Sequence, residues 1–153
     1  MAAYAFVTTW SIRAPLDPVW NAIFHSERWP AWWIGLKRVD ELAPGDATGV
    51  GCVRRFTWQG QLPYTLRVTM HVIRVEPMAV VESLASGELC GRGVWRFSAG
   101  REETTVRYEW DVSTTKRWMN RLAPIARPLF RWNHDVVMRG GERGLRRLLE
   151  PTP

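Results

Sequence analysis

The middle of the chain, from residue 37 to residue 113, consists of short stretches of alternating polar and apolar residues separated by turn residues. Pro and Gly mark the breaks, which fall near residues 44–46, 60, 76–77, 87 and 100. The predicted strands are 37–43, 50–59, 62–75, 79–86, 89–98 and 104–113. Because the breaks are short, consecutive strands can connect only as hairpins, and this predicts an antiparallel meander.

The segment before this meander predicts one more strand and two short helices. Residues 4–13 alternate as a strand does. Asp17 and Pro18 then have the pattern of a helix start, with Asp17 as N-cap and Pro18 as the first helical residue. Residues 26–35 predict a second short helix that Gly35 ends.

The segment after the meander predicts a long amphipathic helix. A helical region opens at residues 116–122, and Pro124 and Pro128 predict a kink or a fresh start before the helix continues to Leu149. The whole order predicts an α+β fold in one domain, residues 1–153. It has a curved antiparallel sheet of about seven strands, two short helices and a long C-terminal helix.

This helix lacks bulk on the face predicted to point inward. At 100° per residue, the predicted inward stripe is Leu122, Leu129, Asn133, Val136, Gly140 and Gly144. Each helical glycine costs about 1 kcal/mol relative to alanine, so something must come close to this face. A closely packed backbone and a bound ligand both satisfy the pattern.

Composition and charge narrow the class of protein. The chain has 46% hydrophobic and 24% charged residues, which is typical of a globular protein, and ten tryptophans against three tyrosines and five phenylalanines. It has no apolar run near the ~18 residues of a membrane span, no signal-peptide pattern at its start, and two cysteines without metal or disulfide spacing. We therefore expect a cytoplasmic location.

Positive charge is concentrated in the C-terminal helical region. The formal net charge is +6, and residues 116–149 hold nine basic and two acidic residues. No nucleic-acid-binding motif accompanies this charge, so no nucleic acid partner is predicted. A solvated helix face explains the arginines, and contact with anionic lipid or a protein partner is the alternative.

The resemblance to a known family rests on three segments: APLDPVWNAIFHSERWPAWW, SGELCGRGVW and RPLFRWNHDVVMRGGERGL. They resemble the START-like, helix-grip superfamily (SRPBCC), which includes the birch-pollen-allergen proteins, and within it the bacterial group of polyketide cyclase/dehydrase and lipid transport-like proteins. The resemblance implies a helix-grip fold with a hydrophobic cavity between the sheet and the C-terminal helix. Members bind lipids, hormones or quinones, and some cyclise polyketides, so no single chemistry is implied.

Strand alternation and the helix stripe nominate the residues that line such a cavity. The candidates for ligand binding are Trp33, Phe56, Trp58, Tyr64, Leu66, Val68, Trp95, Phe97, Tyr108, Trp110, Asn133, Val136, Val137 and Gly140. The alternative is that these aromatic faces form a solid core. Trp32 and Trp33 are also candidates for a lid, and His25 lies near the expected cavity mouth.

Polar residues that could carry catalysis are few. The candidates for polarising a carbonyl or moving a proton are Asn133, His134, Tyr108 and Glu82. Arg54 and Glu82 are the strand charges expected to reach inward, where they should pair. The chain has no nucleophile motif and no histidine spacing typical of a metal site, so neither a metal nor a cofactor is predicted.

Three hypotheses follow for function. The first is binding of a hydrophobic small molecule, such as a lipid, quinone or polyketide-like compound, in the internal cavity. The second is a polyketide cyclase or dehydratase-type enzyme that transfers protons in the same cavity. The third is peripheral contact of the basic C-terminal helix with anionic lipid or a protein partner. The oligomeric state, monomer or homodimer, stays open.

Overall fold

The computed structural model describes residues 3–59, 65–115 and 117–151. Its centre is a seven-stranded antiparallel sheet with the strand order β1-β7-β6-β5-β4-β3-β2. The strands are β1 Ala3–Ile12, β2 Leu36–Pro44, β3 Cys52–Trp58, β4 Leu66–Glu76, β5 Val80–Gly87, β6 Leu89–Ala99 and β7 Thr104–Thr114. The predicted meander is confirmed, and β1 closes its far edge by pairing with β7.

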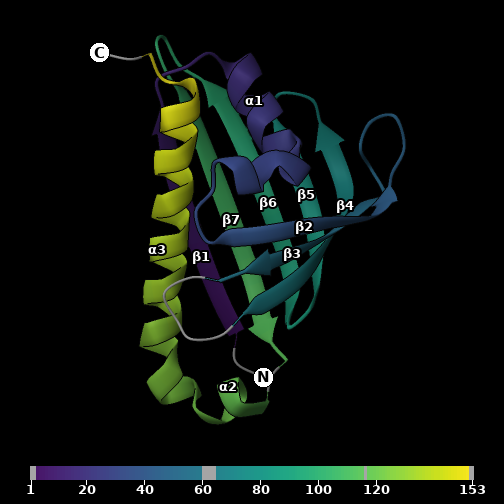
Figure 1. Ribbon diagram of the computed structural model, residues 1–153, viewed down its shortest axis with the longest axis vertical. Coiled ribbons are helices and arrows are strands. Elements are labelled where there is room, and N and C mark those ends of the chain that lie inside the picture. The colour runs from purple at the N-terminus through teal and green to yellow at the C-terminus, as the bar shows by residue number, and fades with distance from the viewer. Residues whose placement is uncertain (1–2, 60–64, 116, 152–153) are drawn as a thin grey trace.

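The sheet curves around one long helix. The helices are α1 Leu16–Phe24, η1 Ser26–Ala31, α2 Arg117–Arg121 and α3 Ala123–Leu149. Figure 1 shows α3 running along the sheet beside β1, with α1 and η1 at one end of the molecule and α2 at the other. The predicted α+β fold, with two short helices and a long C-terminal helix, is therefore confirmed. No helix in the described ranges is long and apolar enough to cross a membrane.

The predicted helix ends differ from the observed ones in two places. Helix α1 begins at Leu16 with Pro15 as N-cap, so Asp17 is not the cap and instead lies in the first turn, where its negative charge favours the helix dipole. Helix η1 is a 3-10 helix that ends at Ala31, and Gly35 lies beyond it with a φ of +99°. The fresh start predicted near Pro124 is confirmed, because α3 begins at Ala123.

The inward face of α3 is rotated from the predicted one. Leu122 and Leu129 are 48% and 52% exposed, whereas Phe130, Met138 and Leu145 are buried. The predicted inward face and the observed buried face are about 100° apart around the helix axis, which is the angle between consecutive residues. Apolar residues cover an arc of α3 wider than the face that the sheet can contact, so periodicity alone selected the wrong side.

The glycines of α3 allow close packing against the segment that follows η1. A Cβ atom on Gly144 would overlap the backbone carbonyl of Trp32, and one on Gly141 would lie 2.5 Å from the ring of Trp33. At Gly140 the nearest atom would be the Ile34 carbonyl oxygen at 3.5 Å, which is an ordinary contact. The glycines therefore make room for the backbone of Trp32 and for tryptophan rings, which are the close neighbours that the sequence implied.

A cluster of tryptophans joins the helix, η1 and the sheet. The ring centroid of Trp33 lies 5.0 Å from that of Trp29, 5.3 Å from Trp10 and 6.3 Å from Trp95. Trp33 Nε1 donates a hydrogen bond of 2.8 Å to the Val137 carbonyl of α3. Trp33 is 2% exposed, so it is a fixed part of the core, and the prediction that it acts as a lid is wrong.

The glycine contacts generate a prediction with a matched control in the same helix. Gly144→Ala should lower the free energy of unfolding by about 1–3 kcal/mol, because the new methyl group meets backbone that cannot move aside. Gly140→Ala should be neutral or should raise it by up to about 1 kcal/mol, because alanine is the better helix former and has room there. Urea denaturation of both variants measures the difference. Equal effects of the two substitutions would contradict the packing described here.

Candidate ligand-binding cavity

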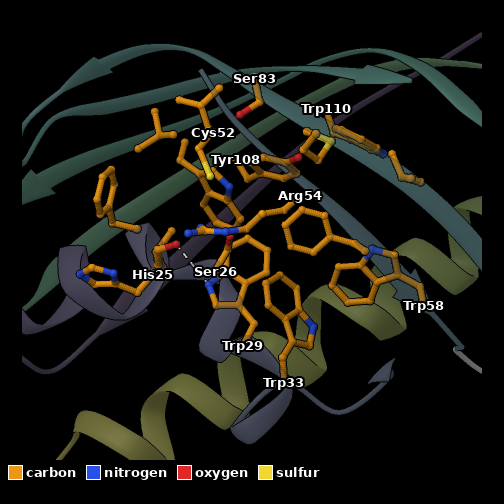
Figure 2. Close-up of a pocket in the computed structure, with 18 of the residues that line it drawn as sticks. His25, Ser26, Trp29, Trp33, Cys52, Arg54, Trp58, Ser83, Tyr108 and Trp110 are labelled. Atoms are coloured by element: carbon orange, nitrogen blue, oxygen red, sulfur yellow. Dashed lines mark hydrogen bonds between the residues drawn. The ribbon is translucent and has the colours of Figure 1, made fainter. Parts of the chain in front are cut away.

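A cavity of about 330 Å³ lies between the concave face of the sheet and α3. Its walls come from the α1–η1 segment, strands β3 to β7, the loop between β2 and β3, and the middle of α3. Figure 2 shows the side chains of Trp29, Trp33 and Trp58 on one side of this space and those of Tyr108 and Trp110 on another. The tryptophan cluster fills the interior next to the cavity, so the molecule contains both a packed core and an open space.

Most of the residues predicted to line the cavity do so. The structure places in the lining Trp33, Phe56, Trp58, Leu66, Val68, Trp95, Tyr108, Trp110, Asn133 and Val137. The alternation that selected the strand residues is confirmed, since their neighbours in sequence face the other side of the sheet.

Three predicted residues lie outside the lining. Phe97 packs edge-on against Trp20 of α1, with centroids 4.9 Å apart, so it belongs to the core next to that helix. Val136 and Gly140 belong to the stripe of α3 that is turned away from the cavity by the rotation of the helix. Tyr64 lies outside the described residues.

Part of the cavity wall is formed by residues that the sequence did not predict there. Val81 and Ser83 of β5 line the cavity, and the alternation of that strand could have identified them. Phe130 and Met138 of α3 also line it, and the correct rotation of the helix would have found them. The residues of the loop between β2 and β3, such as Ala47, carry no pattern that predicts a position in the wall.

An ion-pair network lines the end of the cavity near η1. The Arg54 guanidinium donates to Ser26 Oγ at 2.9 Å and lies 3.0 Å from Glu41 Oε1 and 3.1 Å from Glu27 Oε2. Figure 2 labels both Arg54 and Ser26. Glu27 also contacts His25 Nδ1 at 3.3 Å, and these carboxylates are more than a third exposed, so this end reaches solvent.

The predicted pairing of Arg54 with Glu82 is wrong. Glu82 lies between two residues that face the cavity, so its own side chain faces the other side of the sheet. There it lies 3.3 Å from Arg92 and 3.7 Å from Arg74. Glu82 is therefore not in the lining, and it does not join the other catalytic candidates there.

Two buried polar atoms at the α3 wall lack a hydrogen-bond partner within the described part of the chain. They are Asn133 Oδ1 and His134 Nε2, and both residues line the cavity. Burial lowers the pKa of His134 to about 4, against the opposing effect of the Asp135 charge, so the imidazole is neutral near pH 7. Its ring stacks on Phe6 at 4.1 Å.

The third catalytic candidate in the lining, Tyr108, is also held in its neutral form. Burial raises the pKa of the Tyr108 phenol well above its usual range. Its ring stacks on Trp95, with centroids 4.1 Å apart. Gly93 makes room for it, because a Cβ atom at that position would overlap the tyrosine hydroxyl. The cavity thus contains three neutral hydrogen-bonding side chains within a largely aromatic and aliphatic wall.

Comparison with known proteins finds similarity in structure only. No family model matches the chain, and no curated protein matches it in sequence. A START superfamily protein from Mycobacterium smegmatis superposes with a TM-score of 0.76 at 13% identity, over 95% of this chain and 97% of that one. The Zhui aromatase/cyclase from Streptomyces sp. R1128 gives 0.70 at 12% identity, over 95% of each chain.

A di-domain protein has the same fold in part of its length. BexL, the di-domain ARO/CYC protein of the BE-7585A biosynthetic pathway, superposes with a TM-score of 0.77 at 17% identity over 99% of this chain. The match spans 51% of BexL, so this chain corresponds to about half of that protein. The fold implied by the sequence resemblance is therefore confirmed: the chain has the helix-grip fold of START-like and aromatase/cyclase proteins.

Proposed function

We propose that this protein binds a flat or chain-like hydrophobic small molecule in the cavity between the sheet and α3. The observation that carries the proposal is the cavity itself, about 330 Å³ of space walled mainly by aromatic and aliphatic side chains. That volume is within the range of small-molecule sites, which are concave, mostly apolar and equipped with a few polar groups. The structural similarity to START-like proteins supports a hydrophobic ligand but does not identify it.

The unpaired polar atoms suggest the chemistry of the ligand. A buried polar atom without a partner costs about 1–3 kcal/mol, and the α3 wall holds two of them, Asn133 Oδ1 and His134 Nε2. A hydroxyl group on the ligand would give either atom a hydrogen-bond donor. We therefore expect an apolar molecule with at least one hydroxyl or phenol group directed toward α3.

A second candidate function is proton transfer on such a molecule, as in a cyclase or dehydratase. It is favoured by one observation: Asn133, His134 and Tyr108 all line the same cavity. A neutral His134 can accept a proton through an unpaired nitrogen, and a neutral Tyr108 can donate a hydrogen bond to a carbonyl. Solved aromatase/cyclases share the fold, which is compatible with this chemistry without assigning it.

Filling the cavity tests the proposed site. In Ser83→Phe, the new ring should occupy the cavity and should weaken binding of the apolar fluorophore N-phenyl-1-naphthylamine at least about tenfold. Ser86→Phe is the control, because Ser86 lies on the same strand and is exposed on the opposite face. Fluorescence titration measures both. Unchanged binding by a folded Ser83→Phe variant would place the fluorophore elsewhere and refute the site.

Removing the amide tests the polar contact. Asn133→Leu should raise the free energy of unfolding of the ligand-free protein by about 1 kcal/mol, because an unpaired buried oxygen is removed. The same substitution should reduce the preference of the protein for 2-naphthol over naphthalene, which lacks the hydroxyl group. Thermal unfolding and quenching of tryptophan fluorescence give the two values. A variant that is less stable and keeps the preference would mean that Asn133 serves the fold alone.

The buried histidine generates a prediction of pH dependence. The pKa of His134 is lowered on folding, so between about pH 6.5 and about pH 4 the unfolded chain binds a proton that the folded chain does not. The free energy of unfolding should therefore fall as the pH is lowered through this window, by roughly 3 kcal/mol in all. His134→Gln should remove this part of the slope, and His71→Gln, at an exposed position, should keep it. Equal slopes in the two variants would show that folding does not lower the pKa of His134.

A further inference from the structure

The first half of α3 and its N-cap residue carry an apolar stripe on the outside of the molecule. Its residues are Leu122, Ile125, Leu129 and Trp132, and they are 48%, 72%, 52% and 48% exposed. They account for four of the ten large exposed hydrophobic side chains in the described part of the chain. Of the other six, five lie outside α3 and Leu148 lies at its far end, and isolated exposed hydrophobic residues are normal for soluble proteins. A row of four on one helix face is unusual and is typical of a contact surface.

The position of the stripe explains why the protein leaves it uncovered. In Figure 1, α2 and the first turns of α3 extend past the end of the sheet, beyond the ends of the described strands. The inner side of the same segment does pack, because Phe130 is 7% exposed and lies 4.7 Å from the ring of Tyr4. Arg127 also attaches this segment to β1 by donating to the Ala3 carbonyl at 2.8 Å. The segment is therefore fixed in place with its apolar stripe outward.

The charge around the stripe is mostly positive, and the one exposed acidic residue near it is Asp135, one turn after Trp132. Residues 117–134 contain four arginines and neither Asp nor Glu. Three of these arginines, Arg117, Arg121 and Arg131, are exposed. Exposed Leu, Ile and Trp side chains next to arginines form the pattern of a helix that lies in the interface of a membrane, where the apolar side enters the lipid and the cations meet anionic headgroups.

From this combination we infer that the stripe and its arginines are a docking surface for membranes that contain anionic lipid. A second copy of the chain is a poorer fit, because a symmetric dimer through this face would bring four arginines of each copy together with only Asp135 of each copy to compensate. The inference goes beyond the proposed binding of a small molecule, because it concerns the outer surface. Docking would bring lipid to the outer face of the same segment whose inner face contributes Phe130 and Asn133 to the cavity wall.

Co-sedimentation with vesicles tests the surface. The protein should pellet with vesicles of phosphatidylcholine and phosphatidylglycerol and should remain in the supernatant with phosphatidylcholine alone. Raising the salt from about 0.1 M to about 1 M shortens the screening length from roughly 10 to 3 Å and should weaken binding. An absence of binding to the anionic vesicles at low salt would overturn the inference.

Variants assign the binding to the stripe. Ile125→Ser/Leu129→Ser should weaken binding at least about tenfold, because both side chains would leave the lipid. Val7→Ser/Leu84→Ser removes exposed apolar side chains from the sheet and should leave binding unchanged. Arg131→Gln should weaken it, whereas Arg101→Gln, exposed between β6 and β7, should not. Equal binding by the two double variants would overturn the assignment to this face.

Two further readouts complete the test. Both double variants should unfold at the wild-type temperature, because the residues they change are exposed, so lost binding would not reflect lost folding. Sedimentation velocity without vesicles should give the same oligomeric state for wild type and Ile125→Ser/Leu129→Ser. A wild-type dimer that the double variant dissociates would show that this face joins two copies, and the membrane inference would fail. Binding of N-phenyl-1-naphthylamine in the cavity is measured separately, so the two proposals can fail independently.

Discussion

The contact between the Trp33 indole and α3 sets the distance between the helix and the sheet. The indole donates to the Val137 carbonyl at 2.8 Å, and the absence of side chains at Gly141 and Gly144 lets the tryptophan segment approach the helix. This contact fills the interior with large rings near η1. Farther along the helix no comparable wedge is present among the described residues, and the cavity of about 330 Å³ opens there. The packing that holds α3 thus also determines where space remains.

The polar groups of the cavity divide into two sets with different roles. At the solvent end, the Arg54 guanidinium is bound by two carboxylates and a hydroxyl, so its hydrogen-bonding capacity is largely used within the protein. At the α3 wall, Asn133 Oδ1 and His134 Nε2 lack partners within the described part of the chain. A ligand would gain more from the α3 wall, because there it pairs atoms that are unpaired in the empty protein.

The sequence predicted the sheet well and the helix face poorly, for physical reasons. Gly and Pro at the breaks mark where the strands end. The alternation of side chains along a strand identifies which residues share a face, so Trp95 and Tyr108 were correctly predicted to line the cavity. The rotation of α3 could not be predicted, because apolar residues lie on both its inner face, as Phe130 does, and its outer face, as Leu129 does. The sheet covers only one of these faces. The unpaired state of Asn133 and the pairing of Arg54 depend on contacts between distant segments, which no local pattern encodes.

The central claim is that the space between the sheet and α3 is open and apolar in the folded protein. A crystal structure determined under xenon pressure tests it directly, because xenon enters dry apolar cavities and is readily located by its electron density. The account predicts xenon atoms within the cavity, in contact with residues such as Phe56, Val68 and Trp110. A structure without xenon there, in which those side chains have moved together and filled the interior, would contradict it.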